Sequence, residues 1–290
     1  MELPFPTLWI LGALVACGGS SDDTGTPVPP PDSGELSILA YNVHGLPDAV
    51  TNTEEPGLDR MVQISPLLNA YDLVGLQEVF TPENHNAVLA GTTHGLVQTF
   101  NTPLDSSRAY GAGLEVLAAV GTHLGTEDTF YDACNGILDG ASDCLASKGF
   151  QQVTIDLGDA PLTFVNTHHE AGGGDADEAA RAVQVQQVLD ALAALPSDHA
   201  VIFVGDFNMR ESDPADVAPL QAYADAGLRN LCHELDCPEP DRIDRIHVRD
   251  SDTIAFTALQ WWVAPEFVDA SGNDLSDHDA IAGRVRWDRR

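Results

Sequence analysis

Acidic and amide side chains stand together at one point of the sequence, directly after a run of apolar residues. The run extends from Val201 to Val204 and continues as Gly-Asp-Phe-Asn, in which the polar residues are Asp206 and Asn208. An apolar, mostly β-branched run of this length is typical of a strand buried on both faces. Because side chains alternate along a strand, Asp206 and Asn208 are expected to point to the same side. A carboxylate beside an amide suits a hard divalent cation and a phosphate, whereas the alternative for this stretch alone is a strand followed by an Asp/Asn turn.

Polar residues of the same kind stand at or near the ends of other apolar segments. In chain order the set is Asn42, Gln77-Glu78, Asn166-Thr167-His168, Gly205-Asp206-Phe207-Asn208, Ile243-Asp244 and Ser276-Asp277-His278. A single Asp-His or Gln-Glu pair is common, so the argument rests on the order of the whole set. In composition and order the set resembles the endonuclease/exonuclease/phosphatase superfamily, which has the DNase I-like fold. The resemblance extends from Leu36 to Trp287.

The resemblance implies a hydrolase that cleaves phosphodiester bonds with Mg²⁺, or with another divalent cation such as Mn²⁺. Such a reaction needs a metal to neutralise the phosphoryl oxygens, a base for the attacking water and a group that stabilises the leaving oxygen. By this resemblance, Glu78 binds the central metal and Asn42 helps to hold the metal or a phosphate oxygen. Asp277 is either a further metal ligand or a structural brace.

The catalytic residues that the resemblance implies act on the water and the phosphate. Asp206 and Asn208 would orient them, His278 would be the general base or bind phosphoryl oxygens, and His168 would donate to the phosphate. Asp244 would hydrogen-bond a histidine ring and fix its tautomer.

Other residues of similar type are interpreted as lying outside the site. His169 would point to the opposite face of its strand from the preceding histidine, and His44 and His123 are expected to be loop residues rather than ligands. Asp241 also precedes an Arg-Ile pair, but Asp244 is favoured because its segment continues directly into a His-Val pair.

The order of the elements predicts an α/β (α+β) fold, a two-sheet β-sandwich flanked by helices in four layers, as the resemblance also implies. The clearest helix extends from Asp177 to Leu195, and Pro196 follows its end. The residues on or near one face are Val183, Val188, Leu192 and Leu195.

Two further helices are marked by their ends. Thr81-Pro82-Glu83 predicts a helix start, with an N-cap hydroxyl, a proline at the first position and an acid in the first turn. Apolar residues at helical spacing extend from Leu58 to Ala70, and Pro66 predicts a kink or an early stop there.

Two features bear on the substrate. Lys148, the only lysine, stands in a Lys-Gly-Phe sequence that resembles a segment of bacterial sphingomyelinases of this superfamily. A lysine there could meet a lipid phosphate or be an ordinary turn cation. Trp261 and Trp262 lie in the interval where those sphingomyelinases carry an aromatic, membrane-contacting hairpin. The alternative is core packing, since adjacent strand residues point to opposite faces.

The formal net charge is −32, from 13 basic and 45 acidic residues. Long-range repulsion disfavours a polyanion such as nucleic acid. A lipid headgroup cleaved in the manner of a sphingomyelinase or phospholipase C is therefore the preferred substrate, and an extracellular nuclease of the same fold is the alternative. From a different class, a non-catalytic surface binding protein is the other alternative. A monomer is expected.

The N-terminal residues predict export. Leu3 to Val15 is apolar, too short to span a bilayer and long enough for the core of a signal peptide, and the segment ends at Cys17. This resembles a bacterial lipoprotein processing site with a lipidated cysteine, although the segment carries Glu2 and no basic residue. Residues 18–34 have the composition of a solvated tether, and residues 35–290 form the predicted catalytic domain. The expected location is the cell envelope, through the lipid anchor in the membrane, or the exterior.

Four cysteines remain once Cys17 is assigned to the lipid. Their spacing favours two local disulfides in an oxidising compartment, Cys134–Cys144 and Cys232–Cys237. A four-cysteine zinc site is the alternative, but neither pair has the two-to-four-residue spacing that is usual for it.

Overall fold

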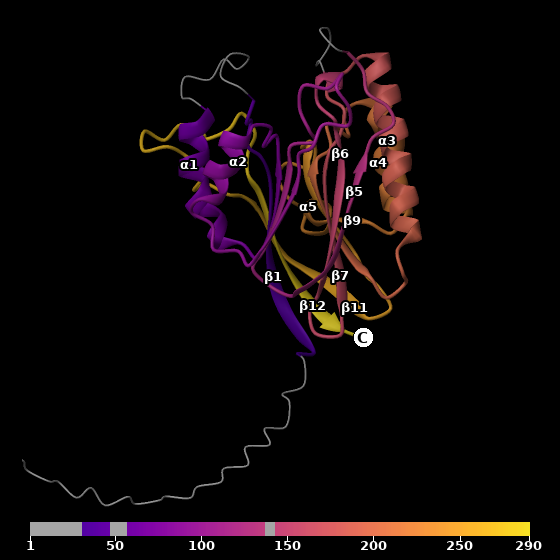
Figure 1. Cartoon of the computed structure of the whole chain (residues 1–290). Helices are drawn as coiled ribbons and strands as arrows, with labels where there is room; N and C mark the ends of the chain where they lie inside the picture. The colour runs from indigo at the N-terminus through magenta and orange to yellow at the C-terminus, as the bar shows by residue number, and fades with distance from the viewer. Residues whose placement is uncertain (1–30, 47–56, 137–142) are drawn as a thin grey trace, which may run out of the picture.

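Two β-sheets packed face to face form the centre of the molecule, and helices cover their outer faces (Figure 1). The computed structural model describes residues 31–46, 57–136 and 143–290. Within these residues each sheet has six strands, and each is mixed, with one parallel strand pair among antiparallel ones. The predicted four-layer α/β sandwich is confirmed.

The first sheet has the strand order β11-β12-β1-β2-β4-β3. Its strands are β1 (Ser33–Asn42), β2 (Leu73–Gln77), β3 (Leu96–Phe100), β4 (Leu114–Ala118), β11 (Ile254–Val263) and β12 (Ile281–Arg289). β1 is parallel to β2 and antiparallel to β12, which places the amino-terminal and carboxyl-terminal strands of the domain side by side. β1 begins at Ser33, within the segment whose composition is typical of a tether.

The second sheet has the strand order β5-β6-β7-β8-β10-β9. Its strands are β5 (Thr122–Phe130), β6 (Gly149–Asp156), β7 (Pro161–His168), β8 (Ala200–Asp206), β9 (Arg229–Asn230) and β10 (Asp244–Arg249). β7 and β8 are parallel, so their carboxyl ends meet at the same edge of the sheet.

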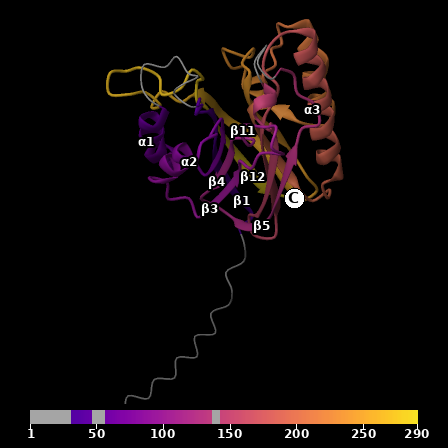
Figure 2. The same ribbon diagram turned by 45° about the horizontal axis from the view of Figure 1, so that its top comes forward.

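Helices flank the two sheets on opposite sides (Figures 1 and 2). The α-helices are α1 (Gly57–Leu67), α2 (Pro82–Leu89), α3 (Asp175–Ala194), α4 (Pro214–Asp225) and α5 (Leu231–Glu234), with 3₁₀ turns η1 (Leu68–Ala70) and η2 (Asp143–Leu145). Thr81 caps α2 as predicted, because its hydroxyl accepts from the backbone N–H of Asn84 over 3.1 Å. α1 ends one residue after Pro66, which agrees with the predicted early stop.

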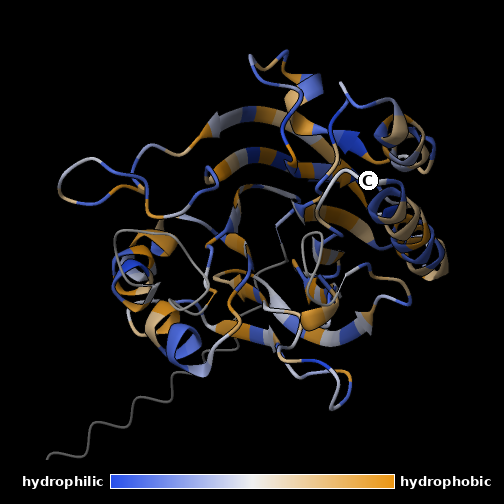
Figure 3. Cartoon of the chain, turned by 90° about the horizontal axis from the view of Figure 1, so that it is seen from above, coloured by the Kyte–Doolittle hydropathy of each residue, from blue (hydrophilic) through white to orange (hydrophobic). Residues whose placement is uncertain are grey.

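Three large apolar clusters hold the layers together, and viewed from above the long helices lie outside the two sheets (Figure 3). One cluster fills the space between the sheets, for example with Ile38 and Val204. A second lies between the first sheet and α1 and α2, and a third between the second sheet and α3 and α4. Because side chains alternate along strands, β1 and β8 each contribute to two clusters.

The buried face of α3 differs from the predicted one at Val183. Val188 and Leu192 are buried as expected, but Val183 is 45% exposed, and Arg181 and Gln184 are buried instead. Five residues correspond to about 500° of helix rotation, which turns Val183 well away from Val188. Arg181 and Gln184 are buried because they donate hydrogen bonds to backbone carbonyls of the loops beside the sheet, at Glu170 and Ala133. Hydrophobicity alone had placed Val183 on this buried face.

Trp261 and Trp262 lie in β11, the edge strand of the first sheet, and both are half-buried. Trp261 packs against the cluster between the sheets, and Trp262 against the cluster beneath α1 and α2, where it stacks on Tyr71. The two rings therefore pack on opposite faces of the sheet, as the strand alternation predicts.

Both local disulfides are present, Cys134–Cys144 and Cys232–Cys237. Cys17, the proposed signal segment 1–17 and residues 18–30 lie outside the described residues. Among the described helices, none is long and apolar enough to cross a membrane.

Candidate active site

The polar residues singled out in the sequence meet at one end of the two sheets, directly above the apolar cluster between them. Asn42 is level with Gln77 across the parallel pair β1 and β2. On the other sheet, Asp206 is level with His168 on one side and with Asp244 on the other. Each polar side chain continues the row of inward-facing residues of its strand, which explains why residues so distant in sequence converge.

Asn42 links two carboxylates from different sheets. Its amide nitrogen donates to Glu78 Oε1 over 2.9 Å and to Asp206 Oδ2 over 3.1 Å. Glu78 Oε2 is buried and has no hydrogen-bond partner, and burial raises the pKa of the Glu78 carboxyl group. An orphaned carboxylate oxygen beside other oxygen ligands is an arrangement that a hard divalent cation would stabilise.

His278 and Asp244 form a hydrogen-bonded pair. His278 Nδ1 lies 2.9 Å from Asp244 Oδ2, and His278 Nε2 lies 3.8 Å from Asp206 Oδ2. Burial disfavours the charged ring, but the hydrogen bond to Asp244 and the nearby carboxylates outweigh burial and raise the pKa of His278 to about 10. The ring is therefore held in one orientation and retains its proton at neutral pH in the absence of a cation.

His168 has the opposite electrostatic character. Its Nε2 lies 3.5 Å from Asp206 Oδ2 and 3.9 Å from Glu78 Oε1, and its Nδ1 is buried without a partner. Burial, together with the positive charge of Lys148, holds the pKa of His168 well below its usual range. The site thus combines a neutral and a protonated imidazole on either side of Asp206.

Backbone strain is concentrated here. Among the described residues other than glycine, positive φ angles occur at His44, Glu78, Asp159, Asn208 and Asp236, and three of these five belong to the site. The amide of Asn208 donates to the carbonyl of His169 over 3.1 Å, and its backbone N–H donates to Asp206 Oδ1 over 2.9 Å. Such conformations persist only where surrounding contacts hold them, and they cluster at functional sites.

Comparison with protein families decides the classification. The model of the endonuclease/exonuclease/phosphatase family matches residues 39–278, a span that contains Asn42 and His278 and every other converging residue. The chain belongs to this family.

Individual relatives agree with the family assignment. A sphingomyelinase from Mycobacterium bovis is 27% identical over 272 residues, which cover 87% of this chain and 53% of the relative. The chain thus spans about half the length of that curated relative. Among solved structures, a mutant of beta toxin from Staphylococcus aureus with bound magnesium ions has a TM-score of 0.64 and 16% identity, over 86% of this chain and 99% of the other. D. rerio TDP2 in complex with a single-stranded DNA product has a TM-score of 0.66 and 19% identity, over 87% of this chain and 98% of the other. At these identities the two structures show the shared fold.

The site of this family member includes a residue that the sequence interpretation left out, His44. It lies in the loop after β1, as expected, but its Nδ1 is 3.1 Å from Asp277 Oδ2 and 4.0 Å from Glu78 Oε2. Asp277, a predicted metal ligand or brace, is half-exposed and braced by this contact. The available signal was spacing, because His44 follows Asn42 by two residues as Asn208 follows Asp206.

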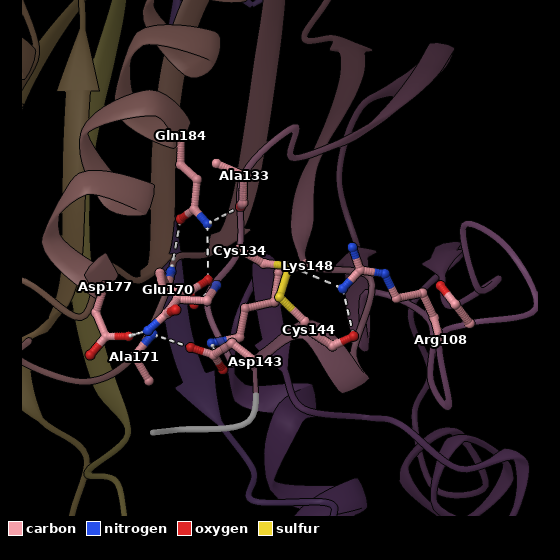
Figure 4. Close-up of a disulfide and its surroundings, with 12 residues drawn as sticks. Arg108, Ala133, Cys134, Asp143, Cys144, Lys148, Glu170, Ala171, Asp177 and Gln184 are labelled. Carbon is pink, nitrogen blue, oxygen red and sulfur yellow. Dashed lines mark hydrogen bonds and ion pairs between the residues drawn. A yellow bond between two sulfur atoms is a disulfide. The ribbon is translucent and has the colours of Figure 1, made fainter. Parts of the chain in front are cut away.

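Lys148 is buried beside the Cys134–Cys144 disulfide (Figure 4). Its ammonium group forms an ion pair with Asp143 Oδ1 over 2.7 Å and donates to the carbonyl of His169 over 2.8 Å. In this conformation Lys148 acts on the site through its charge, which partly offsets the rise that burial causes in the pKa of Glu78 and adds to the fall that burial causes in the pKa of His168.

The remaining candidates lie outside the site. His169 is buried on the other face of β7, where it bonds Tyr223 and stacks on Tyr131. Asp241 accepts from Ser212 at the surface, and exposed His123 contacts Thr126. All three were predicted to have no role as ligands.

Two groups of donors fit a cation. Asp206, Asp244 and His278 each place a ligand atom within 4.8 Å of the others, and Glu78 and Asn42 adjoin Asp206.

A cavity of about 660 Å³ lies elsewhere. Arg245 and His247 line this cavity, and they point to the opposite face of β10 from Asp244. The site residues therefore form their own centre, separate from that cavity.

Proposed function

We propose that the protein is a divalent-metal-dependent phosphodiesterase that cleaves the headgroup phosphodiester of a zwitterionic lipid such as sphingomyelin. The observation that carries the proposal is the convergence of an amide and two histidines on Asp206 Oδ2, which lies within 3.1–3.8 Å of Asn42, His168 and His278. This set contains what phosphodiester hydrolysis needs, namely ligands for a cation, a proton carrier and donors for phosphoryl oxygens.

Glu78, Asn42 and Asp277 are the residues that would hold the metal. The buried oxygen of Glu78 that lacks a partner supports this assignment, as does the magnesium in the beta toxin structure. When bound, Mg²⁺ or Mn²⁺ neutralises charge on phosphoryl oxygens.

The protein's own groups divide the remaining work. His278 Nδ1 is held by Asp244, so Nε2 is the atom that can exchange a proton with the attacking water or bind a phosphoryl oxygen. His168, neutral because it is buried, is placed to donate to a phosphoryl oxygen without adding charge. Asp206 and Asn208 orient the water and the phosphate at the centre of the site.

Four observations support the lipid substrate over nucleic acid. The curated relative is a sphingomyelinase, and Lys148 stands in a Lys-Gly-Phe sequence that resembles a segment of bacterial sphingomyelinases. The net charge of −32 repels polyanions and anionic membranes, whereas a phosphocholine headgroup carries no net charge. Trp261 and Trp262 are half-buried and still offer some apolar surface, and we propose attachment to the cell envelope through Cys17.

A substrate screen tests this proposal. The purified protein is incubated with sphingomyelin or phosphatidylcholine vesicles, single-stranded DNA, RNA and inositol phosphates, first with a chelator and then with added Mg²⁺ or Mn²⁺. Metal-dependent release of phosphocholine is expected, and exclusive cleavage of nucleic acid would replace the proposal by the nuclease alternative. If the protein binds vesicles with or without metal and turns over none of these substrates, it is a surface binding protein.

A further inference from the structure

A buried arginine on α1 contacts two of the chain segments that carry the metal-binding residues. Arg60 is only 3% exposed. Its Nη1 donates to the carbonyl oxygens of Val43 over 3.1 Å and Leu275 over 2.8 Å, and its Nη2 donates to the carbonyl oxygen of His44 over 2.7 Å. All three acceptors are backbone carbonyls rather than carboxylates.

The three carbonyls belong to segments far apart in the sequence. Val43 and His44 directly follow Asn42, whereas Leu275 directly precedes the Ser-Asp-His sequence that ends at His278. Arg60 and Leu275 are separated by 215 residues, so one guanidinium group joins the end of β1 to the loop before β12.

A second contact joins the same two segments. The hydroxyl of Ser276 donates to the carbonyl of Asn42 over 2.7 Å. The ring of His44 also reaches Asp277 over 3.1 Å. The position of Asp277 relative to Asn42 therefore depends on three contacts, made by Arg60, Ser276 and His44. The contact made by Arg60 is the most extensive, because it includes three hydrogen bonds.

The choice of arginine at this position indicates a role beyond filling space. Burial of a charged group is costly, and an apolar side chain would fill the same region, next to Met61 and Ile64, without that cost. A planar guanidinium group, however, offers several donors in a fixed fork and can hold three carbonyls at once. One of them belongs to His44, whose φ of 49° needs such support.

We propose that Arg60 is a positioning residue for the metal site. It fixes the distance between the Asn42 and Glu78 side of the site and the Asp277 and His278 side, without itself touching metal or substrate. The inference rests on the metal site of the proposed function, but not on the identity of the substrate.

The test measures Mg²⁺ binding directly, by calorimetry and by the Mg²⁺-induced rise in melting temperature of the full chain. Arg60→Met removes the fork, and Arg60→Lys keeps the charge but not the planar geometry. Both variants should bind Mg²⁺ roughly 10–100-fold more weakly, as is typical when residues that orient metal ligands are lost. Compared with Arg60→Met, the Arg60→Lys variant should regain more of the wild-type stability than of the wild-type affinity for Mg²⁺.

Arg289→Met is the matched control. Arg289 also donates to backbone carbonyls of two separate segments, at Pro31 and Gly158, but it lies near the carboxyl end of β12, at the opposite end of the sheets. This variant should lose stability and keep the wild-type affinity for Mg²⁺. Wild-type affinity in folded Arg60 variants would overturn the inference, and so would complete failure of both Arg60 variants to fold, because that is what a purely structural arginine predicts.

A double-mutant cycle with Ser276→Ala distinguishes positioning from general stability. Since Arg60 and Ser276 hold the same two segments, their effects on Mg²⁺ affinity should be non-additive, whereas those of Arg289 and Ser276 should add. Additive effects in both cycles would contradict the inference. If the wild type binds Mg²⁺ but cleaves no lipid, the substrate proposal fails while this inference is still tested.

Discussion

Asn42 and Asp206, 164 residues apart in the chain, are joined by a hydrogen bond of 3.1 Å between the amide of one and the carboxylate of the other. Asn42 ends a strand of the first sheet and Asp206 ends a strand of the second, so this bond joins the two sheets at the site. Just below it, Gln77 donates to Asn166 over 2.6 Å across the same interface. The catalytic geometry is thus coupled to the packing of the sandwich, and substitutions can separate the two.

Glu78→Gln should abolish turnover and leave the fold intact. The amide cannot supply the charge that a divalent cation requires, so the rate should fall on the order of 10²–10³-fold or more. Because burial raises the pKa of Glu78, the carboxylate destabilises the metal-free fold at neutral pH, and the free energy of unfolding should stay the same or rise. Activity assays and urea unfolding check both parts. Glu83→Gln, at an exposed acid of α2, is the control, and retained metal-dependent activity in Glu78→Gln would refute the assignment.

Asp244→Asn should lower the pKa of His278 from about 10 towards its ordinary value of 6.5. The carboxylate of Asp244 accepts a hydrogen bond from His278 and its charge favours the protonated ring, whereas asparagine retains the shape but not the charge. NMR titration of the imidazole nitrogens in the metal-free protein measures this shift. An unchanged titration would mean that Asp206 and Asp277, rather than Asp244, hold the proton on the ring.

Glu170 should make stability depend on pH between about 4.5 and 7. Burial, assisted by the nearby carboxylate of Asp143, raises the pKa of Glu170 from 4.5 to about 7. The folded protein then binds more protons than the unfolded chain in this range, so this contribution is complete below the unfolded pKa and is lost as the pH rises to about 7. In the wild type, this carboxyl group should lower the free energy of unfolding by on the order of 2 kcal/mol between pH 5 and pH 8, as measured by urea unfolding. The Glu170→Gln variant should not show this decrease. An equal slope in both proteins would exclude Glu170 as its source.

The strand before Asp206 and the start of α2 could be predicted from the sequence because their signal is local. The apolar run before Asp206 and the hydroxyl of Thr81 at a helix start depend on neighbours within a few residues, and the structure has both features. The convergence of Asn42, Asp206 and His278 followed only from the resemblance to a family, because single-sequence patterns do not give strand order.

The missed features depend on contacts between distant segments. His44 reaches the site because its backbone adopts a left-handed conformation and because its ring contacts Asp277, which is far from it in the sequence. Lys148 forms an ion pair with Asp143 and donates to the carbonyl of His169, just after the end of β7, and no spacing rule describes these contacts. The prediction that Val183 lies on the buried face of α3 was wrong for a related reason, since the polar partners of α3 decide which of its faces is buried.

Replacing both Trp261 and Trp262 by alanine separates packing from membrane contact. Both rings are half-buried, on opposite faces of β11, so we expect a loss of about 2–4 kcal/mol in the free energy of unfolding, less than for two fully buried rings. If their exposed edges also contact lipid, binding to phosphatidylcholine and sphingomyelin vesicles should weaken at a temperature where the variant is fully folded.

Turnover of a soluble phosphodiester by the folded variant is the internal control, because neither ring is assigned to the metal or to proton transfer. Weaker vesicle binding with normal turnover of the soluble substrate would show that β11 meets the membrane. A stable variant with unchanged vesicle binding would leave Lys148 and the sphingomyelinase relative as the support for a lipid substrate. A parallel fall of both activities with the melting temperature would assign the tryptophans to packing alone, since loss of the fold removes every activity together.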